Sequence, residues 1–357
     1  MAFASFLMAQ QSAIFWGVMT WTYAPMKVLR ADIWVAAPQV EQINDYDPLR
    51  LIEVQRVRSV PGVAWASPVF SSPTYARMSD GSHKPIHLMG VDDHTLAGAP
   101  WQEVAGGIET LRQPDAVWID EYGLDRLKPK GGEQLKPGDV FEINERRAVI
   151  AGVFQTRRAF SGAPFLVTTF QRAADYSLPQ RRLATFIIAA AQPGLSPAAL
   201  AGRIEAETGL KAFSEDSLID STLDWWMKNT GVPGSFLTTI IVSLIFGLIV
   251  AAMTFSGYVA QQRQVYAALR AMGASSGQLM SMLVVQSLSL SLLSFAVGLA
   301  GAYAFGASVG KSGVPPFLMT WQIISGVFGA QLLVGLIGPL RCCWEMHRIQ
   351  PADVFRS

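Results

Sequence analysis

Four long stretches of this chain contain no aspartate, glutamate, lysine, arginine or histidine, and they limit its possible folds more than any other feature. They cover residues 1–26, 229–262, 271–310 and 312–340. Each is longer than the roughly 20 apolar residues that a helix needs to cross about 30 Å of hydrocarbon. We therefore expect an α-helical membrane protein with four transmembrane helices, placed at about 3–23, 235–259, 280–303 and 317–340.

The composition agrees with a membrane protein and argues against several other classes. Half of the residues are hydrophobic and only 15% are charged, whereas soluble domains carry about 25% charged residues. The net charge of +1 gives no basic surface, so a nucleic-acid partner is not expected. The only cysteines, Cys342 and Cys343, are adjacent, so disulfides are not expected to hold the fold.

The charges of the short loops predict the orientation in the membrane. The loop at 261–279 carries Arg263 and Arg270, and the tail at 341–357 carries three more arginines, whereas the loop between spans three and four has a single lysine. Lysine and arginine are enriched on the cytoplasmic side of membranes. The loop and the tail are therefore expected inside the cell, which leaves 27–228 outside.

The first apolar stretch is expected to remain as a membrane anchor. A cleaved signal peptide is the alternative interpretation, but no basic segment precedes the apolar run. The expected domain division is a first transmembrane helix at 1–26, a large α+β extracytoplasmic domain at 27–228, and three transmembrane helices with a cytoplasmic loop and tail at 229–357.

The segment outside the membrane has the pattern of an independently folding α+β domain. Asp47 predicts the start of a helix at about 48–59, and Ser196 predicts the start of another helix that stops at Gly209. The ends of the segment are expected to form an α/β layer, with a mostly β insertion at about 96–178. Short β-branched and aromatic runs predict strands at 31–35, 63–70, 74–78, 86–91, 116–119, 140–143, 148–153, 165–169 and 183–190.

A short motif near the C-terminus is similar to a phosphate-binding loop. Residues 306–312 read G-A-S-V-G-K-S, which is one residue too short, because the first glycine of the motif would fall at Phe305. The segment also joins two predicted spans on the outer side of the membrane. We expect no nucleotide site and no cofactor in this chain, so ATP would be hydrolysed by a separate protein.

One cluster contains side chains that could bind a metal, namely His83, His87, Asp92, Asp93 and His94. Three imidazoles suit zinc, but Pro85 interrupts any helix that would place two of them on one face. We expect these side chains to be solvated polar residues of loops, and we expect no metal site. Other carboxylates, among them Asp120, Glu121 and Glu145, have no partner that the sequence places beside them. We therefore expect no catalytic residue, and we expect the chain not to be an enzyme.

Small and polar residues recur inside the predicted spans. Small residues four apart let helices approach closely, and this spacing fits packing within one subunit as well as a dimer interface. Two glutamines could form hydrogen bonds across helices, and we favour that structural role over contact with a substrate. The small residues are Gly298, Ala302, Gly306, Gly326 and Ala330, and the glutamines are Gln286 and Gln331.

The loop at 261–279 is short, basic and partly amphipathic. Its two arginines flank Val265, Tyr266 and Leu269, and Gly273 is expected to end the helix before span three. Such a segment fits a helix that couples the membrane domain to a cytoplasmic partner. It fits equally well a helix lying on the membrane surface with its arginines extended toward water.

The resemblance to a known family rests on short motifs placed around the four expected spans. The runs A-L-R-A-M-G-A-S at 268–275 and I-Q-P-A-D-V-F-R at 349–356 resemble FtsX-like, MacB-type permeases. Further runs are similar to the DevC branch of that family, and together they extend over nearly the whole chain. These are Q-S-A-I-F at 11–15, A-D-I-W-V at 31–35, V-R-S-V-P-G-V at 57–63, G-V-D-D at 90–93 and W-M-K-N-T-G-V-P at 226–233.

The resemblance implies the permease subunit of an ATP-binding-cassette (ABC) export complex in the inner membrane. It implies a permease homodimer, a separate cytoplasmic ABC ATPase, a membrane-fusion adaptor in the periplasm and a TolC-like outer-membrane channel. The outer domain would consist of MacB-like porter and insertion subdomains, and the cargo would be a lipid, a glycolipid or another hydrophobic molecule. Members of the family usually begin with a basic cytoplasmic helix, so either the start of this chain is truncated or that helix is dispensable.

The same resemblance implies which residues couple the chain to its ATPase. It places the contact at residues 263–275, with the tail around Pro351 nearby. The usual pattern of an apolar centre within a polar rim then predicts Tyr266 and Leu269 as a buried anchor, with Arg263 and Arg270 at its flank. Replacing Leu269 with aspartate should therefore uncouple the complex without unfolding it. The full set is Arg263, Tyr266, Leu269, Arg270, Gly273, Ser275 and Pro351. A transmembrane relay that controls an extracytoplasmic hydrolase or sensor is the alternative function, and a stand-alone membrane enzyme is a third.

Overall fold

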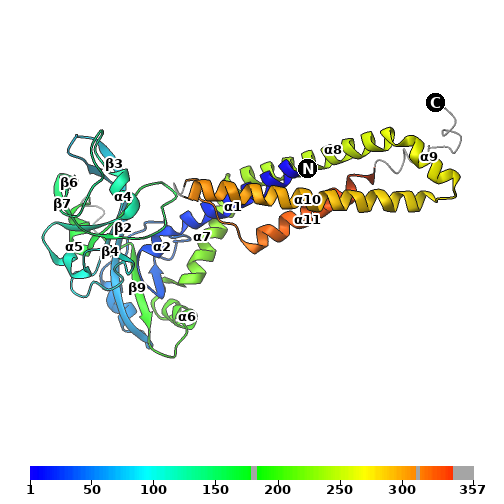
Figure 1. Ribbon diagram of the computed structural model, residues 1–357. Helices are drawn as coiled ribbons and strands as arrows, with labels where there is room; N and C mark the ends of the chain where they lie inside the picture. Colours follow the sequence, from blue (N-terminus) through cyan, green and yellow to red (C-terminus); the bar gives the residue numbers. More distant parts are fainter. Residues whose placement is uncertain (178–182, 311–313, 341–357) are drawn as a thin grey trace. The chain divides into compact units, whose positions relative to one another are not determined.

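The computed structural model describes residues 1–177, 183–310 and 314–340. The chain forms two compact units. One unit consists of Met1–Val18 and Gly231–Ser357, and the other is Met19–Thr230. The first is built from helices, and the second is an α+β domain (Figure 1).

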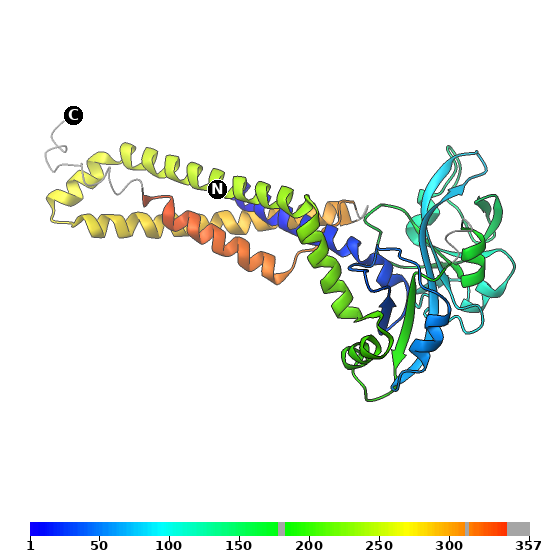
Figure 2. The ribbon, with the colours of Figure 1, turned by 180° about the vertical axis from the view of Figure 1, so that it is seen from behind.

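The helical unit contains the long apolar helices expected from the sequence. Three described helices are long and apolar enough to cross a membrane, namely α1 (Ala2–Thr22), α8 (Val232–Gln261) and α10 (Ser276–Gly310). The fourth apolar helix, α11 (Trp321–Ile337), has 17 residues and is shorter than the span expected at 317–340. Both ribbon views show α8 and α10 side by side, joined through α9 (Arg263–Ala271) (Figures 1 and 2).

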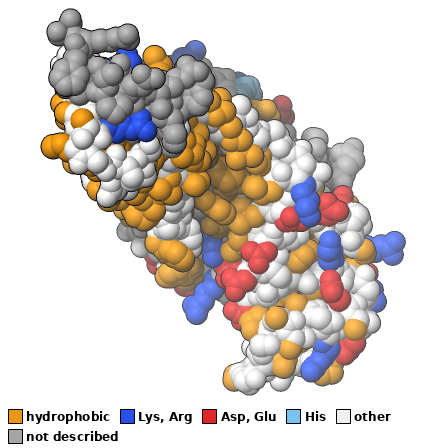
Figure 3. Space-filling view, turned by 90° about the vertical axis from the view of Figure 1, so that its right-hand side faces the viewer, with side chains coloured by type: hydrophobic (Ala, Val, Ile, Leu, Met, Phe, Trp, Pro, Cys, Tyr) orange, Lys and Arg blue, Asp and Glu red, His pale blue; other side chains and the backbone are white. Residues whose placement is uncertain are grey.

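Along their middle turns, α8 and α10 bury small residues. On α8 the buried positions Ser243, Gly247 and Ala251 recur every four residues, and α10 buries Ser287, Ser291 and other small residues in the same way. Large hydrophobic side chains stay on the outside of these helices, and acidic side chains gather over the α+β unit (Figure 3). Helices surrounded by lipid pack in this way, because lipid solvates large apolar side chains and small residues allow close contact.

Two glycines of span three pack against segments of the same chain. A Cβ atom at Gly298 would lie 2.7 Å from the Ala2 carbonyl oxygen and 2.8 Å from the Phe6 nitrogen, both on α1. A Cβ atom at Gly306 would lie 2.5 Å from the ring of Phe317. For these two positions the structure therefore favours packing within one subunit. Gly326 differs, since a Cβ atom there would meet no described atom within 4 Å.

The two glutamines of the spans lie in different surroundings. Gln286 is exposed. Gln331 is buried, and neither its amide nitrogen nor its amide oxygen has a hydrogen-bond partner among the described residues. The backbone carbonyl of Gln331 accepts a hydrogen bond from the Ser291 hydroxyl, which links α10 and α11. The link between α10 and α11 is therefore made by the Gln331 backbone, and the Gln331 side chain does not form the expected hydrogen bond with any described residue.

The α+β unit contains ten strands in one continuous sheet within its described residues. The order of neighbouring strands is β10-β1-β9-β2-β3-β8-β5-β7-β4, and β6 pairs with both β2 and β7. The strands are β1 (Ile33–Ala36), β2 (Val63–Arg77), β3 (His83–Val91), β4 (Glu103–Ala105), β5 (Ala116–Asp120), β6 (Val140–Ile143), β7 (Arg146–Phe154), β8 (Phe165–Thr169), β9 (Phe186–Ala191) and β10 (Lys211–Ser214). Each strand lies where a β-branched or aromatic run predicted one, except β4 and β10.

One long strand, β2, connects the two halves of the sheet. Its first half pairs with β9 from Val63 to Val69, and its second half pairs with β3 from Phe70 to Arg77. The sequence predicted two separate strands here, and the structure shows a single strand of 15 residues. Because β2 also pairs with β6, and β3 pairs with β8, the sheet itself does not divide near residue 96.

The helices of the domain show one confirmed start and one wrong prediction. Helix α6 begins after Ser196, whose hydroxyl accepts from the Ala199 nitrogen at 3.3 Å, and it ends at Gly209 with φ of +69°, as predicted. Helix α3 begins at Ile52, whereas the prediction placed its cap at Asp47. Helix α3 ends at Arg58, and α6 spans Pro197–Thr208. The remaining helices of the domain are α2 (Ala24–Val28), η1 (Ile108–Arg112), α4 (Glu121–Arg126), α5 (Phe170–Asp175) and α7 (Glu215–Asn229).

The late start of α3 is caused by a hydrogen bond to a distant segment. The Leu49 nitrogen donates to the Ala184 carbonyl at 2.7 Å, and the two residues form an isolated β-bridge. This bridge holds the backbone around Leu49 extended, so the helix cannot begin until the following turn. A hydrogen bond between distant segments therefore prevails over the local capping signal.

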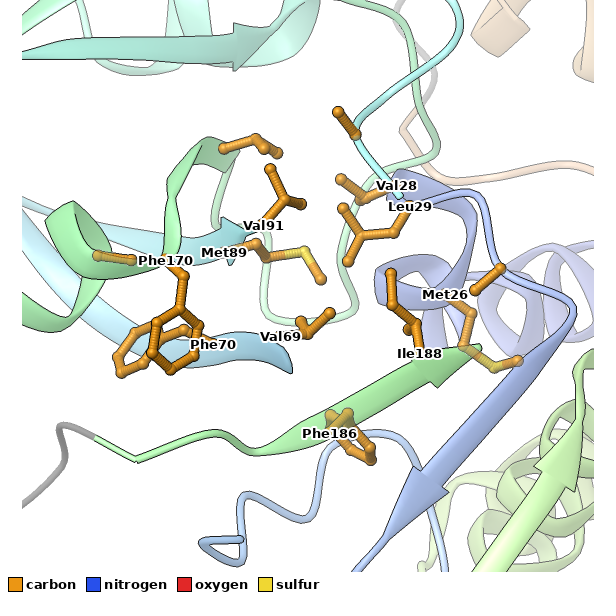
Figure 4. Close-up of a cluster of buried hydrophobic side chains, with 14 of the residues drawn as sticks. Met26, Val28, Leu29, Val69, Phe70, Met89, Val91, Phe170, Phe186 and Ile188 are labelled. Atoms are coloured by element: carbon orange, nitrogen blue, oxygen red, sulfur yellow. The ribbon is translucent and has the colours of Figure 1, made fainter. Parts of the chain in front are cut away.

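The segment that follows α1 is part of the core of the domain. Figure 4 shows Val28 and Leu29 facing Met89 and Val91 of β3, with Ile188 of β9 beside them. All five side chains are buried. The chain is therefore anchored in the domain core within a few residues of the end of the first membrane helix.

Candidate functional site

The predicted coupling loop is a short helical hairpin with a defined turn. Helix α9 ends in a left-handed residue, Gly273, with φ of +99°. The Ala274 nitrogen donates to the Leu269 carbonyl at 3.0 Å, and the Gly273 nitrogen donates to the Arg270 carbonyl at 3.0 Å. This pair of bonds is the Schellman arrangement that ends helices at glycine. Gly273 is therefore required by the geometry of the turn.

The start of α10 is closed by reciprocal hydrogen bonds. The Ser275 hydroxyl accepts from the Gln278 nitrogen at 3.3 Å, and the Gln278 side chain accepts from the Ser275 nitrogen at 2.9 Å. Such a capping box satisfies two backbone donors at once. Arg270 adds a bond from its guanidinium to the Ser276 hydroxyl at 2.7 Å. Ser275 and Arg270 thus fix the shape of the hairpin.

The aromatic residue of the hairpin faces its own chain. Tyr266 is only 4% exposed and belongs to a buried cluster with Phe255, Val259, Leu279 and Leu283, which come from α8 and α10. Leu269 packs against the same cluster. Sequence reasoning assigned both side chains to an anchor in a partner protein, whereas the structure shows them supporting the hairpin from within.

Other apolar side chains of the hairpin point outward. Val265 is 53% exposed and Met272 is 76% exposed, and Arg263 and Gln264 are exposed beside them. Val265 and Met272 are seven residues apart, about two helical turns, which places them near one face. Sequence reasoning did not select Met272. The spacing between Val265 and Met272 would have identified Met272, and it differs from the spacing between Tyr266 and Leu269.

Several residues singled out from the sequence lie outside the described residues. Pro351, the seventh predicted coupling residue, is one of them. Cys342, Cys343 and the end of the phosphate-loop-like motif are others. The described part of that motif, residues 306–310, belongs to helix α10 and does not form a loop.

The histidine and aspartate cluster is dispersed in the structure. His87 is buried in β3, where its Nε2 atom lies 2.8 Å from the Ser71 hydroxyl, and burial lowers the pKa of its imidazole to about 4. His83 is exposed at the start of the same strand. The Asp92 carboxylate accepts from the Thr95 nitrogen at 2.8 Å in a turn. Across the residues that the structure describes, no group of three histidine, cysteine or acidic side chains could hold a metal.

Two of the remaining carboxylates have structural roles. Asp120 caps α4 by accepting from the Gly123 nitrogen at 2.8 Å, and burial raises the pKa of its carboxyl to about 7. Glu145 and Asn144 form the two-residue turn between β6 and β7, with φ values of 65° and 51°. Both positive angles match the turn that suits such hairpins.

The apolar helices, the hairpin and the large α+β unit together define a membrane protein with an extramembrane domain. A family model described as the MacB-like periplasmic core domain matches residues 12–207, and one described as the FtsX-like permease C-terminal matches residues 237–351. The first match covers more than half of the chain. The chain therefore belongs to the FtsX-like, MacB-type permeases, and it is an ABC transporter permease subunit.

Two solved structures illustrate the likeness. The extracellular domain of the noncanonic ABC-type transporter YknZ from Gram-positive bacteria is 13% identical, with a TM-score of 0.36 over 52% of this chain and 100% of that chain. The periplasmic region of MacB from Actinobacillus actinomycetemcomitans is 10% identical, with a TM-score of 0.37 over 58% of this chain and 98% of that one. No curated protein matches the chain.

Proposed function

We propose that this chain is the membrane subunit of an ABC export complex and that a separate cytoplasmic ATPase docks on the hairpin at 261–279. The observation that carries the proposal is the hairpin itself. Its turn is fixed by the bonds at Gly273 and Ser275, and it exposes two apolar side chains beside Arg263. A permease without its own nucleotide site needs a contact that differs between the states of its ATPase, because a ligand shifts only those equilibria to which it binds differentially.

The structure suggests how the work is divided within the hairpin. Val265 and Met272 would form the apolar centre of the interface, and Arg263 would form part of its polar rim, as in most protein interfaces. Tyr266 and Leu269 would hold the shape of the hairpin from inside. A hairpin with a rigid shape loses little conformational entropy on docking, which favours tight coupling.

The finer features of the complex belong to the same proposal. Helix α11 is about 25 Å long at 1.5 Å per residue, and together with the residues that flank it this helix would be the fourth span. The protein would lie in the inner membrane, with its α+β unit in the periplasm. The DevC-like motifs support a homodimer that works with a membrane-fusion adaptor and a TolC-like channel. They also support a lipid, a glycolipid or another hydrophobic molecule as cargo.

Purification of the tagged full-length chain in mild detergent tests the proposed complex. We expect an ABC ATPase and a membrane-fusion protein to be recovered with it, because export requires both. Identification of the co-purifying chains by mass spectrometry is the measurement. Recovery of an extracytoplasmic hydrolase or sensor in place of the adaptor would overturn the export function in favour of a signal relay.

Cysteine labelling tests the orientation on which the docking depends. In a chain whose Cys342 and Cys343 are replaced by serine, Ser79→Cys should react with a membrane-impermeant thiol reagent in spheroplasts. Gln264→Cys should react only after the membrane is permeabilised. Both positions are exposed, so a difference in labelling reports the side of the membrane. The reverse pattern would refute the orientation.

A further inference from the structure

A cavity of the described α+β unit lies beside the chain segment that leaves the first membrane helix. It has a volume of about 860 Å³ and is formed by three segments, at residues 27–32, 101–102 and 155–157, together with Glu215. This size is within the range of sites for small ligands. Leu29 lines the cavity and is also buried in the domain core (Figure 4).

The cavity has an excess of positive charge. Its lining includes Lys27, Arg30 and Arg157 against Asp32 and Glu215. Lys27 and Glu215 pair with each other. Among the described residues, the Arg30 side chain has no hydrogen bond or ion pair, and Arg157 has only a 3.4 Å contact with the Tyr23 hydroxyl. Two guanidinium groups are therefore available to a ligand, with one carboxylate, that of Asp32, beside them.

A second observation, independent of charge, points to a ligand. The Thr156 hydroxyl lines the cavity, its oxygen is buried, and it has no hydrogen-bond partner among the described residues. A buried polar group without a partner is costly, and a ligand with acceptor oxygens would satisfy it. At the edge of the cavity, the ring of Trp101 is 62% exposed.

The cavity lies at the level where the first membrane helix ends. Tyr23, which Arg157 contacts, directly follows helix α1. The Phe160 nitrogen donates to the carbonyl oxygen of Trp21, in the last turn of that helix, at 3.2 Å. Tryptophan and tyrosine at the end of a span mark the membrane–water interface. Arg157 therefore contacts a tyrosine at the end of the first membrane helix, and this places the cavity close to that end of the helix.

From this arrangement we propose that the cavity binds a phosphate group, supplied by the head group of a phospholipid in the outer leaflet of the membrane. Arg30 and Arg157 would pair with the phosphate oxygens, since guanidinium matches phosphate geometry with two parallel hydrogen bonds. The Thr156 hydroxyl would donate to a third oxygen. The exposed Trp101 ring would lie against the glycerol or acyl portion of the lipid. This site does not depend on the docking of an ATPase.

Binding of short-chain fluorescent phosphatidylglycerol to the full-length chain in mild detergent tests the proposal. The variant Arg30→Gln/Arg157→Gln should bind at least about tenfold more weakly, because two charge-assisted bonds are lost. The matched control is Arg146→Gln/Arg147→Gln, which removes the same charge from another part of the domain and should bind like the unaltered chain. An equal loss in both variants, or no loss in either, would overturn the proposal.

Two further measurements identify the source of the phosphate and the role of the hydroxyl. Glycerol phosphate that competes at millimolar concentration would show that a free phosphate ester suffices, whereas competition only by lipid would show that the membrane anchor is needed.

Thr156→Val should also weaken binding, and Thr156→Ser should restore it, because serine keeps the hydroxyl. If Thr156→Val binds normally and the melting temperature is unchanged, the hydroxyl has no role and the site as described is wrong.

Discussion

Replacing both Val265 and Met272 with aspartate is expected to abolish stimulation of the partner ATPase while leaving the membrane domain folded. A hot-spot side chain at the centre of an interface contributes about 2 kcal/mol, so the loss of two such side chains would weaken binding roughly a thousandfold. Both side chains are exposed in the chain alone, so the aspartates can remain in water until the partner docks. Co-purification and ATPase activity in proteoliposomes measure the effect.

A matched control separates docking from a general effect of added charge. Val104 in β4 is 52% exposed and Val140 in β6 is 46% exposed, close to the 53% of Val265, and Val104→Asp/Val140→Asp adds the same two charges to the other unit. This variant should keep full ATPase stimulation. If the Val265 and Met272 double variant also keeps full binding and full export, the hairpin is a surface helix and the coupling assignment fails.

The structure changes how a substitution at Leu269 should be interpreted. Leu269→Asp would bring a carboxylate against the cluster that contains Tyr266 and Leu283, so it would disturb the hairpin itself. Loss of coupling in that variant would not distinguish a missing contact from a distorted loop. The exposed pair, Val265 and Met272, gives the sharper test.

Replacing Gly298 with leucine is expected to prevent stable assembly of the membrane helices. A Cβ atom at this position would lie 2.7 Å from the Ala2 carbonyl and 2.8 Å from the Phe6 nitrogen, and backbone atoms cannot move aside as a flexible side chain can. Overpacking of this kind costs about 1–3 kcal/mol or more. The loss should appear as a lower melting temperature in detergent and less protein in the membrane.

The exposed neighbour of Gly298 provides the control for this experiment. Ala300 lies two residues further along α10 and faces outward. Ala300→Leu adds bulk at the same depth, where lipid can adapt to it, and should leave the melting temperature nearly unchanged. A Gly298→Leu protein as stable as the Ala300→Leu protein would show that α1 and α10 do not pack as closely as the structure indicates.

Local signals were sufficient to predict much of the α+β unit. The capped helix after Ser196 and the strands β5, β6 and β8 lie where the sequence placed them, because capping bonds, turn residues and buried β-branched runs act over a few residues. The start of α3 was wrong because the competing bond comes from Ala184, more than a hundred residues away. The continuity of β2 was missed because its two halves are held by different partners, β9 and β3.

The turn of the hairpin was predicted from the sequence, but the directions of its side chains were not. The breaker residues Gly273 and Ser275 marked the turn correctly, because helix ends have specific local chemistry. The direction of Tyr266 could not be read from a nine-residue helix, since its burial depends on Phe255 and Leu283 in the flanking spans. The length of the fourth apolar helix was also overestimated, because freedom from charge does not by itself fix where a helix begins or ends.

The position of β1 in the sheet has a consequence for how the protein is made. Its two neighbours are β9 and β10, and Ile33 pairs with both Ala189 and Ser214. A ribosome that adds 5–20 residues per second needs about 10–40 s to travel from residue 33 to residue 214. Until β9 has been made, the apolar segment Ile33–Ala36 has no strand beside it, and its pairing is complete only when β10 follows. The sheet can therefore close around β1 only when nearly all of the domain has been synthesised.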